Sequence, residues 1–310
     1  MTAPDTASAP VAPWAVEGAT QVVAEHVSPT RAALRRFLRH RLAIVGVVLV
    51  AIIIVMAVAA PVLTPWQPNR IDFVTGSRQP PSSLHVLGTD VVGRDVWSRV
   101  LFGARTSVTV GLGAVGLYLM IGTILGMIAG FYGGAFDQLI MRFTDTILSI
   151  PPLLLIIVFV SVIGPSIGSV ILVIALLGWP VTCRLVRGQL LVLRESEFIT
   201  AARVVGAPDR TILFRHMLPN ALGPLTVVAT FGVATAVLLE SSLSFLGLGV
   251  RPPEASWGNL ITEAISPVVL NTLPWQWMPA AIAITATVLG VNFIGDGLRD
   301  AIDPKTVRRR

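Results

Sequence analysis

The sequence predicts an all-α membrane protein that crosses a bilayer about six times. Hydrophobic residues make up 54% of the 310-residue chain and charged residues only 13%, which excludes an ordinary soluble globular protein. A run of roughly 20 apolar residues spans a bilayer as a helix, and charge-free windows of that length recur along the chain. A transmembrane β-barrel would need short segments of alternating polarity, and these windows do not alternate.

The charge-free windows divide into six predicted membrane helices. The window from 146 to 183 is too long for one span, and we divide it at Gly164-Pro165 because both residues interrupt helices. The first helix follows a polar tail of about forty residues and exceeds a signal-peptide core, so we expect it to remain uncleaved. The six helix cores are predicted near 42–63, 107–130, 147–163, 168–183, 222–243 and 277–295.

Basic residues fall mainly on one side of this predicted topology. With the N-terminus inside, most of the 23 Lys and Arg residues lie in the N-terminal segment, the second and fourth loops and the C-terminal tail. Cytoplasmic loops carry such an excess, so both termini are expected to be cytoplasmic. The same asymmetry explains the basic net charge without nucleic-acid binding. Residues 31–41 are expected to form a basic, partly helical segment on the inner membrane surface. Its arginines either anchor the chain by the positive-inside effect, which we favour, or bind anionic lipid headgroups.

The chain is expected to have four parts. Residues 1–30, rich in Ala, Pro and Thr, are predicted to be a disordered cytoplasmic tail. Residues 31–106 hold the first membrane helix and an external amphipathic connector. Residues 107–304 form the membrane core, with a polar loop at 184–220, and residues 305–310 form a basic tail.

Two local patterns predict how the helices pack. Gly122, Gly126 and Gly130 recur at four-residue steps, which lets helix backbones approach closely in a membrane. Upstream, the sequence after Asp95 predicts a short amphipathic helix at the external interface, leading into the second span. Its polar side would carry Arg94, Asp95 and Arg99.

The sequence offers no catalytic residues, no metal site and no cofactor site. There is one cysteine and there are four scattered histidines, so no cysteine-based cluster can form. The one lysine is Lys305 and no Gly-x-x-x-x-Gly-Lys-[Ser/Thr] sequence occurs, so this chain cannot bind ATP through a P-loop. We therefore expect a non-catalytic membrane subunit.

The polar loop predicts two short helices joined by an elbow. Residues 195–205 are good helix formers, and Gly206 would end that helix as a C′ glycine. Pro208 suits the first turn of a second helix, which Pro219 would interrupt before the fifth span. Because the elbow is built from small residues, it could enter a groove on another protein.

Three sequence blocks together resemble the C-type permease subunit of dipeptide, oligopeptide and nickel ABC importers. They are His-x-Leu-Gly-Thr-Asp-x-x-Gly-Arg-Asp from His85, the loop from Glu197 to Asn220, and Leu-Glu-x-x-Leu-Ser-Phe-Leu-Gly-Leu-Gly from Leu239. The resemblance covers about residues 31 to 304 and implies the type I ABC importer permease fold with a cytoplasmic coupling helix. Thr200 departs from the pattern, since many relatives have Glu there.

The resemblance implies a role in a larger importer. A B-type permease would complete the pathway, two ABC ATPases would bind ATP and Mg, and an extracytoplasmic binding protein would deliver substrate at the bacterial cytoplasmic (inner) membrane. The residues it assigns to ATPase coupling are Glu197, Thr200, Ala201, Ala202, Gly206, Ala207, Pro208, His216 and Pro219.

Substrate identity is less determined by the sequence. Peptides are the first expectation, because peptide importers dominate the family, and nickel or haem are the alternatives. An ion-coupled secondary transporter would carry charged residues within its spans. The predicted cores hold only Glu240, close to the outer end of the fifth helix, where a structural or interface role is expected. The candidates for the substrate pathway are the polar residues Thr226, Thr230, Thr235, Glu240 and Asn292. The threonines and Asn292 could equally form local helix–helix hydrogen bonds.

Overall fold

A computed structural model describes residues 29–251 and 254–302, and their regular structure is helical apart from two isolated bridges. The elements in chain order are α1 (Pro29–Arg39), α2 (Arg41–Leu63), α3 (Val96–Tyr132), α4 (Gly134–Leu148), α5 (Pro152–Ile163), α6 (Ile167–Arg194), α7 (Glu197–Val204), α8 (Asp209–Thr211), the π-helix η1 (Ile212–Met217), α9 (Leu218–Phe245), α10 (Trp257–Ile261), the 3₁₀ helix η2 (Thr262–Ile265), α11 (Pro267–Thr272) and α12 (Pro274–Ile302).

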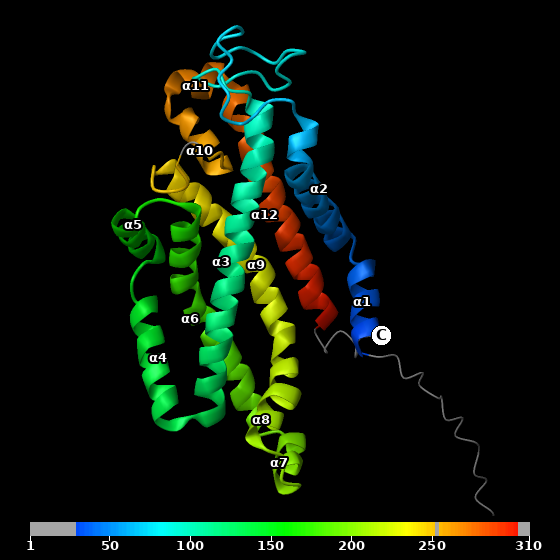
Figure 1. Cartoon of the computed structure of the whole chain (residues 1–310). Helices are drawn as coiled ribbons and strands as arrows, with labels where there is room; N and C mark the ends of the chain where they lie inside the picture. The colour runs from blue at the N-terminus through cyan, green and yellow to red at the C-terminus, as the bar shows by residue number, and fades with distance from the viewer. Residues whose placement is uncertain (1–28, 252–253, 303–310) are drawn as a thin grey trace, which may run out of the picture.

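The helices form an elongated bundle with two different ends (Figure 1). The connector 64–95 with α10 and α11 covers one end, which we call the cap end. The helix α7, α1 and the last turn of α12 lie at the opposite end, which we call the α7 end. The first and last described helical turns therefore lie at the same end as the loop (Figure 1), while the termini lie outside the described residues.

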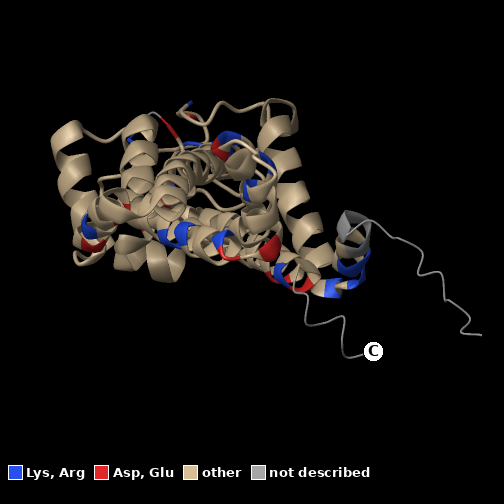
Figure 2. Ribbon diagram, turned by 90° about the horizontal axis from the view of Figure 1, so that it is seen from below, with Lys and Arg blue, Asp and Glu red and all other residues tan. Residues whose placement is uncertain are grey.

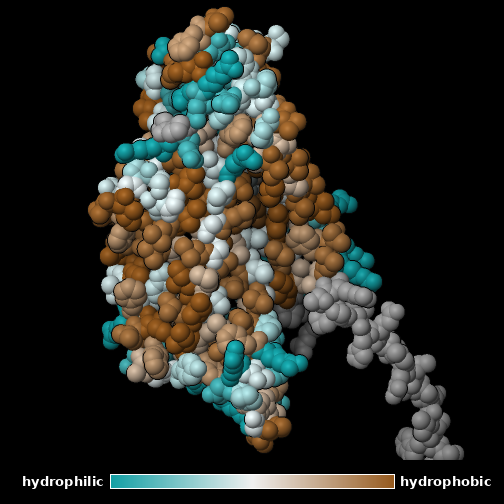
Figure 3. Space-filling model, in the orientation of Figure 1, coloured by the Kyte–Doolittle hydropathy of each residue, from teal (hydrophilic) through white to brown (hydrophobic). Residues whose placement is uncertain are grey.

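Five described helices are long and apolar enough to cross a membrane, and a sixth crossing is possible if the bent pair α4 and α5 is one span. Figure 3 shows a broad brown hydrophobic region around the middle of the bundle, with teal hydrophilic residues at both ends. Apolar side chains on this belt are exposed because lipid, rather than protein, is their expected neighbour. The predicted all-α membrane fold with about six spans is confirmed.

The predicted third helix, 147–163, is wrong as a single element. The chain forms α4 and α5 instead, which meet at an angle of 88°. Pro151 has extended ψ (122°), and it is followed by Pro152, which disfavours helical geometry in the residue before it. Two successive prolines thus end α4 and start α5. By contrast, the break predicted at Gly164-Pro165 is present, and Gly164 has φ of +95°.

The fifth helix also differs from its prediction. Pro219 does not interrupt it, because α8, η1 and α9 form one continuous helical segment from Asp209 to Phe245. In the π-helical turn, the N–H of Leu218 donates to the carbonyl of Leu213, five residues earlier. This wider turn accommodates a proline that cannot donate a hydrogen bond itself. The loop 184–220 is correspondingly shorter than expected, since α6 continues to Arg194.

The glycine seam on α3 packs within this chain, against α6. A Cβ atom at Gly122 would lie 2.7 Å from the carbonyl oxygen of Trp179, and one at Gly126 would lie 2.7 Å from that of Cys183. Gly130 faces the next turn of α6 in the same way. The prediction of a close packing face is confirmed, and its partner is now identified.

The segment expected to lie on the membrane surface packs against the end of α12. The Arg36 guanidinium donates to the carbonyl of Ala301 at 3.2 Å, which satisfies a free carbonyl at that helix end. Phe37 lies over Gly297, and His40 Nε2 is 3.5 Å from a carboxylate oxygen of Asp300. The helix α1 begins at Pro29, and the predicted tail otherwise lies outside the described residues, as does the segment 305–310.

Candidate functional site

The helix α7 and its elbow form a rigid projection at the α7 end. The N–H of Ala207 donates to Ala202 O at 3.0 Å, and the N–H of Gly206 donates to Arg203 O at 2.9 Å. With Gly206 at φ +85°, this is a Schellman C-cap, as the sequence predicts. Pro208 follows as the N-cap residue of α8, one position earlier than expected.

A hydrophobic cluster anchors α7 to the membrane helices. Ile199 on α7 is fully buried against Ile212 and Met217 of η1, together with Leu190 of α6 and Phe131 of α3. Burying one such side chain contributes about 1.5–3 kcal/mol. The cluster therefore packs α7 against α3, α6 and the start of α9.

The opposite face of the projection is uncovered and apolar. Val204 is 82% exposed and Val205 is 87% exposed, and Phe198 is exposed as well. Nothing lies within 4 Å of the position that a Cβ atom on Gly206 would occupy. Basic residues surround this apolar tip along α7, α8 and η1, and Figure 2 shows the charged segments from this end. Such a tip can insert into a groove on another protein.

The coupling residues predicted from the sequence all lie on or beside this projection. Glu197, Thr200 and Ala201 are exposed on α7, while Ala202 and Ala207 are half-buried against the anchoring cluster. The remaining predicted residues lie in the elbow and at the base, namely Gly206, Pro208, His216 and Pro219. The structure adds Ile199, Val204 and Val205, which an amphipathic reading of the α7 sequence could have found.

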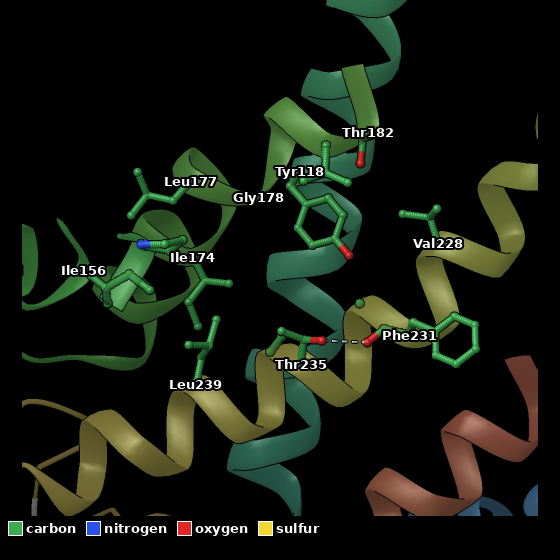
Figure 4. A pocket seen from close by; sticks show the side chains of 14 residues that line it. Tyr118, Ile156, Ile174, Leu177, Gly178, Thr182, Val228, Phe231, Thr235 and Leu239 are labelled. Carbon is green, nitrogen blue, oxygen red and sulfur yellow. Dashed lines mark hydrogen bonds between the residues drawn. The ribbon is translucent and has the colours of Figure 1, made fainter. Parts of the chain in front are cut away.

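A cleft of about 400 Å³ lies between α3, α5, α6 and α9 (Figure 4). Its walls are almost entirely apolar, and Tyr118 is its largest polar side chain. A Cβ atom at residue 232 would lie 1.6 Å from the Tyr118 hydroxyl, so only glycine fits there. The Thr182 hydroxyl, also in this wall, is buried without a hydrogen-bond partner among the described residues.

The five predicted pathway residues do not form one site. Thr235 lines the cleft of Figure 4, and its hydroxyl donates to Phe231 O at 3.0 Å. Thr226 and Thr230 likewise donate to carbonyls of their own helix, and Thr230 faces a second apolar cleft between α2, α3, α9 and α12. Asn292 is half-buried on α12. The helix–helix hydrogen bonds expected as the alternative are not formed by these three threonines among the described residues, because their hydroxyls bond within α9.

Glu240 is fully buried in a cage of serine hydroxyls near the cap end. Ser107 donates to one carboxylate oxygen at 2.9 Å and Ser244 donates to the other at 2.8 Å. Ser256 contacts Ser244 at 3.4 Å, and the N–H of Trp257 lies 3.4 Å from the Ser107 hydroxyl. The carboxyl group thereby joins α3, α9 and α10. This arrangement agrees with a structural role and does not place Glu240 on an open path.

The polar residues at the start of α3 are buried rather than exposed at the membrane interface. One oxygen of Asp90 lies 2.5 Å from Arg99 Nη1 and 2.7 Å from Arg94 Nε. The same Arg99 nitrogen lies 2.8 Å from Glu263 of η2. Asp95 is also buried; it caps α3 by accepting from the N–H of Ser98. The expectation of an amphipathic helix is corrected: α3 begins at Val96 as one continuous helix whose polar side is enclosed by the cap.

Burial and the neighbouring arginines together shift the pKa values of the carboxyl groups in this cap. Burial pushes the pKa of Asp90 upward, but the Arg99 charge and the hydrogen bond from the Arg94 backbone outweigh it, so the pKa falls below 3.8. The pKa of Glu263 moves in the opposite direction, because burial outweighs the attraction of Arg99, and Asp90 adds repulsion. The network fastens the connector 64–95 to α3 and η2.

A Gly-x-Ser-x-Gly spacing at residues 164–168 resembles the surroundings of hydrolase serines, but the structure assigns it another role. Ser166 is the N-cap of α6 and accepts from the N–H of Ser169 at 3.0 Å. Within the described residues its hydroxyl contacts only Ser169. In the part of the chain that the structure describes, no His, Lys, Asp or Glu side chain is hydrogen-bonded to it.

The fold and these surfaces define a multi-pass membrane protein with a projecting helix at one end and a closed cap at the other. Comparisons with known proteins refine this class. Residues 122–308 match the model described as the binding-protein-dependent transport system inner membrane component. Residues 28–81 match the N-terminal transmembrane domain of oligopeptide transport permease C. The chain belongs to this family of inner-membrane permeases.

Two relatives illustrate the similarity. A protein named as a peptide permease in Brucella suis biovar 1 is 45% identical over 285 residues, which cover 92% of this chain and 94% of the relative. A dipeptide transport system permease of Alkalihalophilus pseudofirmus is 42% identical over 279 residues, covering 90% of this chain and 91% of the relative. Family members are generally non-catalytic subunits of ABC importers.

Proposed function

We propose that this chain is one of two permease subunits of an ATP-driven importer of peptides. The projecting α7 elbow supports this function most directly. It is preorganised by a Schellman cap, exposes Val204 and Val205, and is anchored to the membrane helices through Ile199. A B-type permease would complete the pathway, and separate ATPases would bind ATP and Mg at the α7 end.

The orientation of the chain follows from its charges. Arginines are frequent on α1, at the end of α6 and along the segment from α7 to η1. An excess of basic residues favours the cytoplasmic side, so the α7 end faces the cytoplasm with both termini. The cap end then faces an extracytoplasmic binding protein.

In the proposed coupling mechanism, movement of α7 and its elbow is passed through η1 to the membrane helix α9. When the ATPases close, the groove that holds α7 moves, and Ile199 carries the movement to η1 and α6. Because Asp209 to Phe245 is continuously helical, displacement at η1 reorients α9, which lines both apolar clefts. These clefts open and close as the two permeases separate and approach.

Peptides are the proposed substrate class because both relatives described above are named for peptide transport. The apolar walls around Tyr118 fit side chains of varied chemistry better than a metal ion, which would need oxygen, nitrogen or sulfur ligands. Among the described residues no group of three His, Cys, Asp or Glu side chains could hold a metal ion. Nickel chelates and haem are the competing substrates.

The test is reconstitution with the neighbouring gene products. We expect the tagged chain to co-purify with a second permease and ATPase, and proteoliposomes containing the complex and a binding protein to accumulate a labelled di- or oligopeptide only with ATP. Uptake of a nickel chelate or haem instead would reassign the substrate. A chain that purifies alone and responds to a proton or sodium gradient would refute the importer.

A further inference from the structure

The turn at residues 72–76, in the connector of the cap, displays two large apolar side chains. Phe73 is 87% exposed and Val74 is 96% exposed, the largest exposed fraction of any large hydrophobic residue in the described chain. Isolated apolar residues are common on protein surfaces, so exposure alone assigns no role. What distinguishes Phe73 and Val74 is that hydrogen bonds hold the backbone of their turn in place.

The backbone of this turn is held in place from several directions. One carboxylate oxygen of Asp72 accepts from the N–H of Val74 at 2.9 Å, and the other lies 3.2 Å from Nε2 of the buried His85. The N–H of Asp72 donates to Gly93 O at 2.9 Å, and the carbonyl of Gly76 accepts from a threonine hydroxyl of the connector. The turn therefore cannot easily collapse to bury Phe73.

The carboxyl group of Asp72 remains ionised in this setting. Hydrogen bonds from the hydroxyl of Thr75, the N–H of Val74 and the ring of His85, in this order of effect, lower its pKa well below the usual range. The hydrogen bonds of the turn thus persist at physiological pH. An ordered, exposed apolar pair loses little conformational freedom on binding, which favours association.

Two arginines accompany the apolar pair. Arg70 and Arg78 are exposed, and within the described residues neither forms a salt bridge. The Arg70 guanidinium lies 5.4 Å from the centre of the Trp66 ring. Arg78 adopts φ of +57°, a conformation that is uncommon for residues other than glycine, and its N–H donates to Asp90 O. The complementary surface is an apolar pocket with an acidic rim.

We infer that Phe73 and Val74 dock into an apolar, acid-rimmed pocket on the extracytoplasmic substrate-binding protein. This inference rests on the proposed function. The connector lies beyond the cap-end ends of α3 and α12 (Figure 1), and the hydrophobic belt ends below the hydrophilic cap (Figure 3). Lipid chains cover the belt, whereas a soluble protein approaches the cap from above. The arginines steer an acidic partner toward the turn.

The decisive experiment measures binding to the whole importer in nanodiscs. The double variant Phe73→Ser with Val74→Ser is compared with Val268→Ser, which removes an apolar side chain of 58% exposure from α11 at the same end. We expect the double variant to weaken binding of the purified binding protein by about tenfold or more, with complex assembly and basal ATPase rate unchanged. Binding within twofold of wild type would overturn the inference.

A label on the turn identifies what touches it. The chain's one cysteine, Cys183, is buried, so an environment-sensitive fluorophore on Phe73→Cys reports from residue 73. A blue shift on adding the binding protein supports docking, and quenching by brominated lipids in its absence overturns it in favour of membrane insertion. If the wild-type complex lacks ATPase or ATP-driven uptake, the proposed function fails instead, and that result is independent of these variants.

Discussion

Replacing Gly206 with leucine should separate ATP hydrolysis from transport. Any L-residue at φ +85° incurs a strain of roughly 1–2 kcal/mol. No atom beyond the two neighbouring residues lies within 4 Å of the Gly206 Cβ position, and the exposed elbow leaves room for a larger side chain. The added bulk is therefore expected to act mainly on a partner. If the elbow fills a groove on the ATPase, the clash should also weaken the free energy of ATPase binding by about 2 kcal/mol or more, as the loss of a binding hot spot does.

Three variants separate the effect of backbone strain at residue 206 from the effect of side-chain bulk. Gly206→Ala introduces the strain with a minimal side chain, and Gly206→Leu adds the bulk. Gly164→Leu is the matched control, since Gly164 has φ of +95° and also nothing within 4 Å of its Cβ position. The assay is ATPase co-purification in mild detergent, followed by ATP-driven uptake in proteoliposomes.

A loss of about 2 kcal/mol corresponds to roughly 30-fold weaker ATPase binding. We expect this loss for Gly206→Leu, a smaller one for Gly206→Ala and none for Gly164→Leu. Equal behaviour of the two leucine variants would refute the reasoning, because strain or general membrane misfolding would then explain the effect. Normal uptake by Gly206→Leu would remove the elbow from the coupling mechanism altogether.

Three further predictions concern stability, each measured by thermal unfolding in detergent. Glu240→Ala should destabilise the protein by about 1–3 kcal/mol, because it leaves buried serine hydroxyls without a partner. Glu240→Gln should retain most of the stability, and equal losses for the two variants would contradict the serine cage. Gly126→Leu should lower the free energy of unfolding by about 1–3 kcal/mol or more through overpacking, because even its Cβ atom would lie 2.7 Å from a carbonyl oxygen of α6. The control Gly116→Ala should be neutral or stabilising, because nothing lies within 4 Å of that Cβ position. The pKa of Asp90 is lowered in the folded state, so its contribution to stability is fully present above the ordinary value of 3.8 and is lost as the pH falls through the lowered pKa. Asp90→Asn should therefore flatten the decline in stability on the acid side. An unchanged decline would assign the pH dependence to other groups.

The elbow and the cap differ in how far the sequence predicted them. The C-terminal end of α7, the C′ role of Gly206 and the break at Gly164 were predicted correctly, because each depends on the backbone freedom of one glycine and its immediate neighbours. The start of α7 was predicted two residues too early, since Glu195 is the C-cap of α6. The lipid-facing helices were predicted because span length follows from bilayer thickness. The glycine seam was recognised as a packing face, although the sequence left its partner open.

The pairings of distant polar residues required the structure. Arg99 meets Glu263, which is 164 positions away, and Ser107 meets Glu240 across 133 positions. In the sequence Arg99 was placed on a polar helix face, because periodicity describes only which side of a helix a residue occupies. Whether that side meets lipid, water or a carboxylate is decided by the elements that pack beside it.

By itself, the sequence determined the membrane class, the approximate number of spans and the elbow, since hydrophobic length and backbone permissiveness are local properties. The tertiary structure decided the 88° turn between α4 and α5, the unbroken helix through Pro219 and the burial of Glu240. It also decided that Phe73 and Val74 are held in solvent. The burial of Glu240 and the support of Phe73 and Val74 depend on hydrogen bonds between separated segments, which only the folded chain brings together. The turn between α4 and α5 and the helix through Pro219 depend instead on local backbone geometry at prolines, which hydrophobic length does not specify.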